Sequence, residues 1–324
     1  MRLGKVRVHV FALLFGSLCT VASAQVPARP FRLGLLVLNT MPVEQPVIAL
    51  LAARGFAEGK NLVIERRRAE GHPERLPAMA ADLVREKVDV LVAFTDAPAF
   101  AARNATRDIP IVVWGAHDAV GTGLVASLAR PGGNVTGVES LAPVLEAKRV
   151  QFLRELRPAL NRLAVLHNPA DQGSAVHLRV ARTAADPLGI NVLPIAVATR
   201  EDVEPAMTEM NRQRPDAMLV FTDPMTNFAF DRAAEVARAR RLPTACEFRE
   251  FVHRGCLFSY GGTLAEFNDR AASLIVQILQ GARPSDLPIQ QVTRVELVLN
   301  RGIARQIGVT FPETMLLRAD AVIE

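Results

Sequence analysis

Short apolar runs alternate with helix-period segments along most of this chain, and that alternation restricts the possible folds more than any other feature. The runs RLGLLVL at 32–38 and LAVLH at 163–167 are nearly unbroken stretches of Leu and Val, each bounded by turn-forming or polar residues. Strands of this kind are typical of parallel sheets that helices cover on both faces. The pattern therefore predicts repeated βα units.

The predicted units fall into two sets separated by a glycine-rich stretch. The first set has strands at 32–38, 62–65, 88–94 and 109–114, with helices at 47–56, 73–86 and 97–106. The second set has strands at 163–167, 190–197, 217–221 and 243–246, with helices at 145–156, 175–185, 201–213 and 228–240. A tail with strands at 257–261 and 289–298 and a helix at 264–279 is left over. We therefore expect an α/β fold of two Rossmann-like lobes, with a chain that passes between the lobes more than once.

The first 24 residues have the pattern of a secretory signal peptide. Basic residues are followed by an apolar run at 8–18 and then by Ala22-Ser23-Ala24, with small residues at the positions that precede cleavage. The apolar run is shorter than the roughly 20 residues that span a bilayer. We expect cleavage after Ala24 and export to the periplasm.

The charge of the chain offers no support for nucleic-acid binding. The formal net charge is +5, but three of the basic residues and no acidic residue lie in the signal peptide, so the remainder carries +2. No block of Lys and Arg with interleaved aromatic residues is present. We therefore expect no nucleic-acid partner.

Two cysteines, Cys246 and Cys256, remain after cleavage. An exported pair ten residues apart can form a disulfide between neighbouring strands. Each cysteine also has apolar neighbours, among which a free thiol packs as a small hydrophobic group. The sequence leaves both interpretations open.

The stretch Gly121-Thr122-Gly123 resembles the start of a dinucleotide-binding loop, but its context differs. Such a loop opens a helix directly after the first strand of a βαβ unit, with an acidic residue about 20 positions later. Here the stretch follows the fourth predicted strand, and Glu139 does not end a second strand of such a unit. We expect no nucleotide cofactor; a tight turn at 130–134 and an approach to a hinge explain the glycines better.

The sequence also lacks the usual patterns of hydrolases and metal sites. There is no G-x-S-x-G elbow, and the six histidines are scattered, with no pair spaced by four residues beside a glutamate. For His167 and His177 surface or helix-capping roles are expected. The predictions are no catalytic residue, no cofactor and no metal.

Polar residues follow the predicted strands of both lobes, at the edge where open parallel sheets bind ligands. The residues selected as ligand-binding candidates on this basis are Asn39, Thr40, Thr95, Asp96, Ala97, Asp118, Asn168, Thr222, Asp223 and Glu247. Thr95 or Asp96 can cap a helix whose free N–H groups would hold an anion such as a carboxylate, while Asp118, Asp223 or Glu247 could face an amino group. Individually, such residues are also common as caps and turn formers.

Four segments resemble the exported substrate-binding proteins of ABC importers, in the branch grouped with tryptophan- and tyrosine-type binding proteins. They are GFAEGKNLVIERRRAEGHPERLPAMAADLV at 55–84, GTGLVASLARPGGNVTGV at 121–138, REFVHRGCLFSYG at 249–261 and PETMLLRADAVIE at 312–324. The resemblance extends from Phe31 to the C-terminus. It implies a type I periplasmic-binding fold, in which two lobes joined by a three-segment hinge close on a small ligand.

The resemblance also implies lobe boundaries and roles for several candidates. Lobe 1 would contain residues 31–138 and 259–291, and lobe 2 residues 139–258 and 292–324. The turn at 95–98 matches the family's small-residue turn, whose backbone N–H groups meet a ligand carboxylate, although Asp96 stands where a neutral residue is more usual. Asp118 and Asn168 match positions after strands of lobe 1 and lobe 2.

The expected function is solute binding for an ABC importer. The ligand would be a small solute such as an amino acid or related carboxylate, the partners a permease and its ATPase, and the protein a monomer. The sequence leaves two other functions open. One is a sensor that presents its ligand to a membrane receptor, and the other is an exported enzyme that uses Asp96, Asp118 and Asp223 as acid and base groups.

Overall fold

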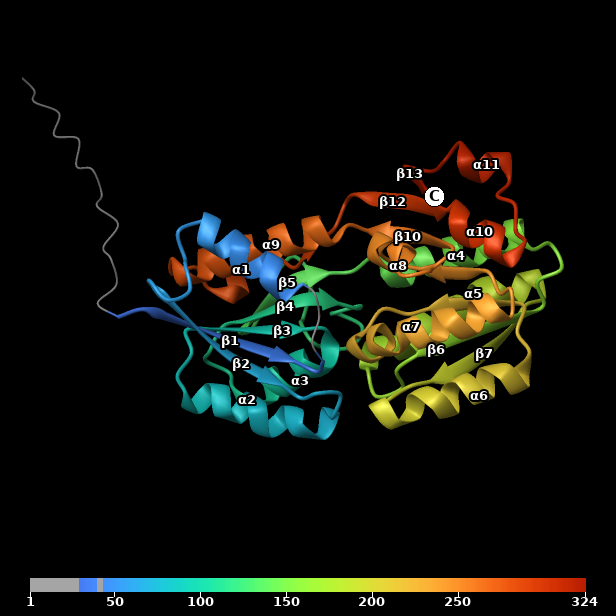
Figure 1. The fold of residues 1–324 in the computed structure, drawn as a ribbon. Helices are drawn as coiled ribbons and strands as arrows, with labels where there is room; N and C mark the ends of the chain where they lie inside the picture. Colours follow the sequence, from blue (N-terminus) through green and yellow to red (C-terminus); the bar gives the residue numbers. More distant parts are fainter. Residues whose placement is uncertain (1–28, 40–42) are drawn as a thin grey trace, which may run out of the picture.

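The protein forms two α/β lobes that lie side by side (Figure 1). The structure is a computed structural model, and it describes residues 29–39 and 43–324. The expected signal peptide and Thr40 lie outside the described residues. The expectation of two α/β units with largely parallel sheets is confirmed.

Lobe 1 is built on a six-stranded sheet with the order β11-β5-β4-β3-β1-β2, in which every pair is parallel. Its strands are β1 (Phe31–Val37), β2 (Leu62–Arg68), β3 (Val90–Phe94), β4 (Ile111–Ala116), β5 (Val135–Glu139) and β11 (Gln290–Gln291). Its helices are α1 (Glu44–Ala53), α2 (Leu76–Arg85), α3 (Asp96–Ala105) and α9 (Leu264–Leu279), with short 3₁₀ turns η1 (Pro73–Arg75) and η4 (Pro284–Asp286). Helices α1 and α9 cover one face, and α2 and α3 cover the other.

Lobe 2 has a seven-stranded sheet with the order β13-β12-β10-β9-β8-β6-β7. Its strands are β6 (Arg162–His167), β7 (Asn191–Ala196), β8 (Ala217–Val220), β9 (Thr244–Cys246), β10 (Phe258–Gly262), β12 (Val295–Asn300) and β13 (Ala321–Ile323). Its helices are α4 (Ala142–Leu156), α5 (Gln172–Ala185), α6 (Val203–Gln213), α7 (Pro224–Ala239), α8 (Arg249–His253), α10 (Arg301–Ile307) and α11 (Glu313–Leu316), with η2 (Asp186–Leu188) and η3 (Arg200–Asp202). The pairing is parallel except between β10 and β12.

The central strands explain why the sequence lacks strand alternation. All residues of β3, β4 and β8 are buried, because helices lie on both faces of each sheet. Burial of apolar side chains contributes about 25 cal/mol per Å² of area removed from water, so these strands hold much of the folding free energy. The strands that are most hydrophobic along the sequence are thus the central ones in space.

The chain passes between the lobes three times, after β5, after β10 and after β11. Glu139, at the end of β5, accepts hydrogen bonds from the Ala119 backbone N–H at 2.7 Å and from Gln291 Nε2 at 2.9 Å. One carboxylate thus ties two of the crossing segments together. The expected three-segment hinge is present.

The tail differs from the sequence prediction in two places. Strand β10 pairs with β9 and β12, so residues 259–262 belong to the sheet of lobe 2, and the expected lobe boundary at 258/259 is wrong. The single strand expected at 289–298 is two strands, because β11 pairs in lobe 1 and β12 pairs in lobe 2. The apolar pattern is continuous there because each of the two strands belongs to a sheet, β11 to that of lobe 1 and β12 to that of lobe 2.

The glycine-rich stretch before β5 serves the backbone. The Asp118 side chain accepts a hydrogen bond from the Gly121 N–H at 2.9 Å, and a Cβ on Gly121 would lie 2.1 Å from that carboxylate. Gly123 and Gly132 have positive φ, which glycine adopts without strain. Gly137 of β5 lies so close to β4 that a Cβ would be 2.3 Å from the Val113 carbonyl oxygen. These four glycines therefore meet local steric or conformational needs.

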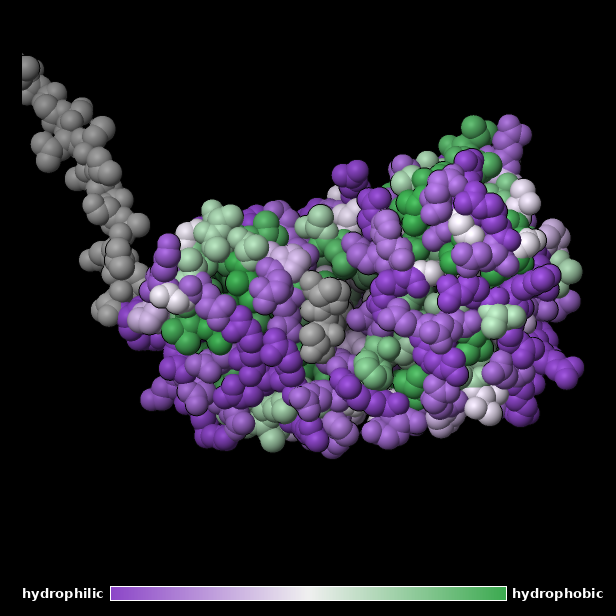
Figure 2. All heavy atoms as spheres, in the orientation of Figure 1, coloured by the Kyte–Doolittle hydropathy of each residue, from purple (hydrophilic) through white to green (hydrophobic). Residues whose placement is uncertain are grey.

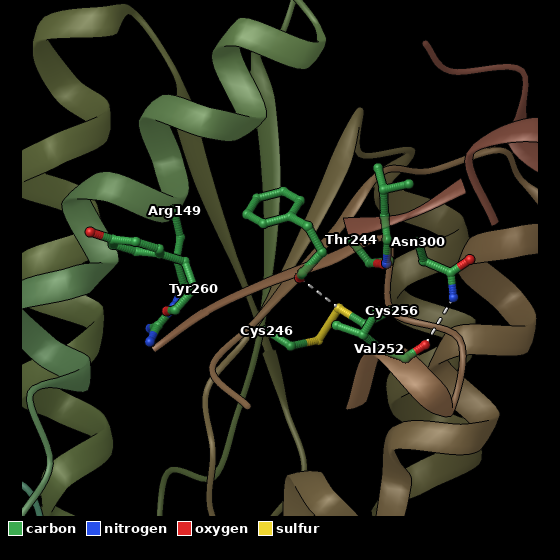
Figure 3. The surroundings of a disulfide bond; sticks show 9 residues. Arg149, Thr244, Cys246, Val252, Cys256, Tyr260 and Asn300 are labelled. Carbon is green, nitrogen blue, oxygen red and sulfur yellow. Dashed lines mark hydrogen bonds between the residues drawn. A yellow bond between two sulfur atoms is a disulfide. The ribbon is translucent and has the colours of Figure 1, made fainter. Parts of the chain in front are cut away.

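Cys246 and Cys256 form a disulfide, so the first of the two interpretations is correct (Figure 3). The bond joins the end of β9 to the residues just before β10, and both cysteines are fully buried. It closes a short loop that contains α8. Cys246 is the last residue of β9, and Glu247 follows it directly. Closing a loop of this length restricts the unfolded chain and stabilises the fold by about 3 kcal/mol.

Reduction of this disulfide is expected to lower the free energy of unfolding by about 3 kcal/mol, because the unfolded chain regains the entropy that the cross-link removes. The measurement is urea unfolding of the exported protein with and without dithiothreitol. The double variant C246A/C256A is the control, and its unfolding should not respond to the reductant. A wild-type midpoint that is unchanged by reductant would contradict the prediction.

Candidate functional site

The carboxyl ends of the two sheets face each other, and their polar residues meet between the lobes. At one point the approach is very close: a Cβ on Gly173 of α5 would lie 2.5 Å from Asp96 Oδ2 and 2.7 Å from His117 Cβ. Gly173 belongs to lobe 2, whereas Asp96 and His117 follow β3 and β4 of lobe 1. The lobes are therefore in contact, and only glycine allows this approach.

Most of the predicted site residues lie along this contact. Asn39 follows β1, and its Oδ1 accepts a hydrogen bond from Arg200 Nη2 of the opposite lobe at 2.9 Å. Thr95 and Asp96 follow β3 and are buried, while Ala97 is half-buried. Asn168, Thr222, Asp223 and Glu247 follow β6, β8 and β9 of lobe 2, and all four are buried. The strand-end reasoning thus selected residues that the fold brings to one region.

Two small cavities between the lobes have an aromatic wall. The larger, of about 60 Å³, is lined by Val43, Trp114, Thr222, Asn227, Phe248, Glu250, Phe251, Arg254 and Leu264. The smaller, of about 10 Å³, is lined by Thr95, Trp114, Gly115, His117, Ser140, Thr222, Glu247, Phe248 and Phe267. The ring centroids of Trp114 and Phe267 are 5.2 Å apart, and those of Phe248 and Phe267 are 5.7 Å apart. Residues of both lobes therefore enclose an apolar, ring-lined space.

The indole of Trp114 is held in a defined orientation. Its Nε1 donates a hydrogen bond of 2.9 Å to Asn268 Oδ1 on α9, and its ring contacts Phe94 and Phe267 at centroid distances of 5.9 and 5.2 Å. This hydrogen bond satisfies the only polar atom of the side chain. The rest of the indole is apolar and borders both cavities.

Three polar groups at the cavities have buried atoms without a hydrogen-bond partner among the described residues. They are the hydroxyls of Thr95 and Thr222 and Oε2 of Glu250. Burial raises the pKa of Glu250 above its ordinary value. A buried polar atom without a partner costs about 1–3 kcal/mol, and a ligand that supplies the partner recovers that free energy.

Thr95 has a backbone conformation that is unusual for its residue type. Its φ is 73°, a region that β-branched residues rarely adopt, and it precedes the first turn of α3 without a side-chain capping bond. Such strain is concentrated at ligand-binding and catalytic positions, because the surrounding structure must maintain it. The conformation leaves the Thr95 hydroxyl uncommitted at the cavity wall.

The Asp96 side chain pairs with His117. Asp96 Oδ2 lies 2.7 Å from His117 Nδ1, and both carboxylate oxygens accept from the His117 backbone N–H at 3.2 Å. Burial lowers the pKa of His117, but the charges of Asp96, Asp171 and Glu247, together with the hydrogen bond to Asp96, outweigh burial and raise the pKa to about 9. The result is a buried, neutralised ion pair at the N-terminus of α3.

Two of the predicted acidic residues are used locally. Asp118 is half-buried and accepts from the Gly121 N–H, which closes a turn. Asp223 caps α7, with Oδ1 accepting from the Met225 N–H at 2.7 Å and from Asn168 Nδ2 at 3.3 Å. Burial raises the pKa of Asp223. Glu247 accepts from the Ser140 hydroxyl at 2.7 Å and lines the smaller cavity.

The expected surface position of His167 and His177 is wrong, since both side chains are buried. His177 Nδ1 lies 2.9 Å from Glu146 Oε1, and Arg149 also pairs with Glu146 at 2.7 Å. Burial raises the pKa of Glu146 to about 7, although Arg149 opposes the shift. The pKa of His177 falls well below its ordinary value because of burial and the neighbouring positive charge of His117.

Sequence reasoning missed the aromatic wall. Trp114 and Phe248 were both part of strand-end segments, but the low aromatic content of 5% argued against an aromatic site. Phe267 lies on a helix of the C-terminal tail and reaches the cavity only because that tail returns to lobe 1. The useful signal was the position of the single tryptophan at the end of a buried strand.

Comparison with known proteins identifies the family. The family model described as ABC transporter substrate binding protein matches residues 43–323. The chain belongs to this family.

Relatives within and around the family have known ligands or structures. A tyrosine-binding protein of Clostridioides difficile is 26% identical over 253 residues, which cover 78% of this chain and 72% of that protein. A Streptococcus pneumoniae ABC domain solved in complex with L-Trp is 25% identical, with a TM-score of 0.82, and covers 91% of this chain and all of its own. A conserved domain protein of Vibrio cholerae is 28% identical, with a TM-score of 0.84 and the same coverage.

The likeness in structure extends beyond these relatives and defines the fold. Two solute-binding proteins that are 14% and 13% identical match 83% and 88% of this chain, with TM-scores of 0.59 and 0.62. The fold is that of the type I periplasmic-binding proteins, as expected. Family members are extracytoplasmic binding proteins, and among the described residues no helix is both long and apolar enough to cross a bilayer.

Substitution of Gly173 by Ala is expected to hinder contact between the lobes, because the added Cβ would overlap Asp96 and His117. Alanine favours a helix over glycine by about 1 kcal/mol, so any loss of closure arises from the overlap and not from a weaker α5. We expect a larger radius of gyration by small-angle X-ray scattering and a red shift of the Trp114 emission.

The matched control for this variant is Gly133→Ala, since a Cβ there meets nothing within 4 Å and the residue lies away from the lobe contact. That variant should behave as the wild type. Wild-type scattering and emission from Gly173→Ala would mean that this contact does not govern closure.

Proposed function

We propose that this protein is the solute-binding component of an ABC importer and that its ligand is an amino acid with an aromatic or large apolar side chain. The observation that carries the proposal is the aromatic wall of Trp114, Phe248 and Phe267 beside two buried hydroxyls that have no hydrogen-bond partner among the described residues. A flat apolar side chain fits the rings, and a polar head group satisfies the hydroxyls. The relatives named for tyrosine binding and solved with L-Trp support this ligand class.

The N-terminus of α3 is suited to the ligand carboxylate. Helix N-termini attract anions through free N–H groups and the helix dipole. Asp96 would repel such an anion if its charge were isolated, but the His117 side chain pairs with it at 2.7 Å. The carboxylate would therefore meet Thr95 and the first turn of α3, as expected for the turn at 95–98, with the Asp96 charge neutralised.

Acidic groups of lobe 2 are suited to the ligand amino group. Glu247 lines the smaller cavity, as does Thr95 of lobe 1, and Glu250 lines the larger cavity. Among the expected candidates, Glu247 fits this role better than Asp118 or Asp223, because those two side chains close a turn and cap a helix. Carboxylate recognition by lobe 1 and amine recognition by lobe 2 would make both lobes necessary for binding.

Ligand entry requires the lobes to separate. The cavities of about 60 and 10 Å³ are far smaller than the 300 Å³ or more that a small-molecule site needs. Hinge motion at the three crossings would open the cleft, and closure would exclude water from the bound solute. The closed, monomeric protein would then dock on the permease, and its ATPase would drive uptake from the periplasm.

The two other functions remain distinguishable by experiment. A sensor would bind the same solute but would not stimulate the ATPase of a reconstituted permease complex. An enzyme would convert the solute, whereas a binding protein retains it unchanged in a stoichiometric complex, as mass spectrometry can show. We favour the importer because the family model describes transporter components.

Binding should be visible through the only tryptophan of the chain, Trp114, which lines both cavities. Titration with L-phenylalanine or L-tyrosine, excited selectively at the indole, should change its emission with saturation at one ligand per chain. L-Tryptophan is tested by calorimetry instead, because it fluoresces itself. Absence of saturable binding for all three amino acids would overturn the proposed ligand class.

Substitution of Thr222 by Val is expected to weaken binding about tenfold, because the isosteric side chain removes one hydroxyl that the ligand would satisfy, worth about 1.4 kcal/mol. The control is Thr208→Val on the exposed surface of α6, which should bind as the wild type. Calorimetry measures both variants. Equal loss in the two variants would show that Thr222 does not contact the ligand.

A further inference from the structure

Three ionisable side chains from the two lobes meet beside the candidate solute site. They are Asp96 and His117 of lobe 1 and Asp171 of lobe 2, whose potential ligand atoms all lie within 4.8 Å of one another. All three side chains are buried, with exposed fractions of 0, 4 and 3%. A buried cluster that crosses the cleft forms only when the lobes are together.

Asp171 has a free oxygen in this cluster. Its Oδ1 caps α5 by accepting from the Gly173 N–H at 2.9 Å and the Ser174 N–H at 3.3 Å. Its Oδ2 is buried and has no hydrogen-bond partner among the described residues. A buried carboxylate oxygen without a partner is costly, which indicates that another group completes the site.

The charges around Asp171 do not balance when it is ionised. His117 supplies one positive charge, but Asp96 already uses it through the 2.7 Å contact. Three further acidic groups lie close enough to influence the cluster: Asp223 and Glu247 add negative charge, whereas Glu146 is paired with Arg149. The site therefore favours an additional positive charge.

We propose that Asp96, His117 and Asp171 bind a divalent transition-metal ion, with Zn²⁺ as the best match. One imidazole nitrogen and two carboxylate oxygens form a ligand set that Zn²⁺ accepts, with water completing a tetrahedral shell. Asp171 would bind through Oδ2 and keep its capping bonds through Oδ1. The ion takes the place of the proton on His117, which is released on binding.

The ion would link the two lobes, because its ligands come from both. A group that binds only the closed form stabilises that form, so binding of the ion would favour contact between the lobes. This proposal differs from the sequence prediction of no metal site. The three proposed ligands lie on separate segments of the chain, so their spacing in the sequence matches no metal-binding motif. The proposal concerns ion binding alone and does not require the importer function.

The test is calorimetric titration of Zn²⁺ into the exported protein after chelator treatment and dialysis. The wild type should bind one Zn²⁺ per chain at this site. Asp171→Asn should weaken that binding by about 100-fold or more, because loss of a direct ligand should cost at least as much affinity as loss of a residue that only hydrogen-bonds to a ligand. Asparagine caps helices as well as aspartate does, so α5 should be preserved. The matched control is Asp202→Asn, whose carboxylate completes the capping box of η3 away from the cluster; this variant should bind Zn²⁺ as the wild type.

Co²⁺ gives a second readout that needs no variant. In the wild type, the absorption bands of Co²⁺ in the visible range should have the intensity of a tetrahedral site, and Zn²⁺ should abolish them. Circular dichroism verifies that Asp171→Asn is folded. Zn²⁺ binding that is absent in the wild type, or equally strong in Asp171→Asn, would overturn the proposal, as would Co²⁺ spectra typical of a hydrated ion.

Discussion

The contact between the N-terminus of α5 and the Asp96–His117 pair is the interaction on which the closed molecule depends. It places a backbone glycine against two polar side chains of the opposite lobe, with no room for a Cβ at Gly173. This contact buries the polar side chains that follow the central strands of both sheets. Each of them must then find a partner within the protein or in a bound solute or ion.

Most polar side chains at the strand ends have hydrogen-bond partners within the protein. Those that have none in the described part of the chain lie at the candidate solute and ion sites. Asp223 and Asn168 serve the cap of α7, and Glu247 pairs with Ser140. The hydroxyls of Thr95 and Thr222 and the Oδ2 atoms of Asp171 and Asp223 have none among the described residues. The hydroxyls border the aromatic cavities, whereas Asp171 lies with Asp96 and His117, so a solute and an ion would complete different parts of one cleft.

The disulfide and the hinge position this cleft from outside. Cys246 lies directly before Glu247 and Phe248, so the cross-link restrains the strand end that carries a polar and an aromatic wall residue. Glu139 binds two of the crossing segments next to the same region. The cross-link thus restrains this strand end of lobe 2, and opening would take place at the three crossings.

The order of the βα units, the two lobes and the polar edge of each sheet can be predicted from the sequence, because apolar periodicity and chain order are local properties. Thr95, Asp96, Thr222 and Glu247 are predicted to lie at that edge in the same way. The pairing of β10 in lobe 2, the place of Phe267 in the aromatic wall, and the meeting of Asp171 with Asp96 and His117 are visible only in the folded protein. These facts depend on contacts between segments far apart in the chain, and no local pattern encodes such distances.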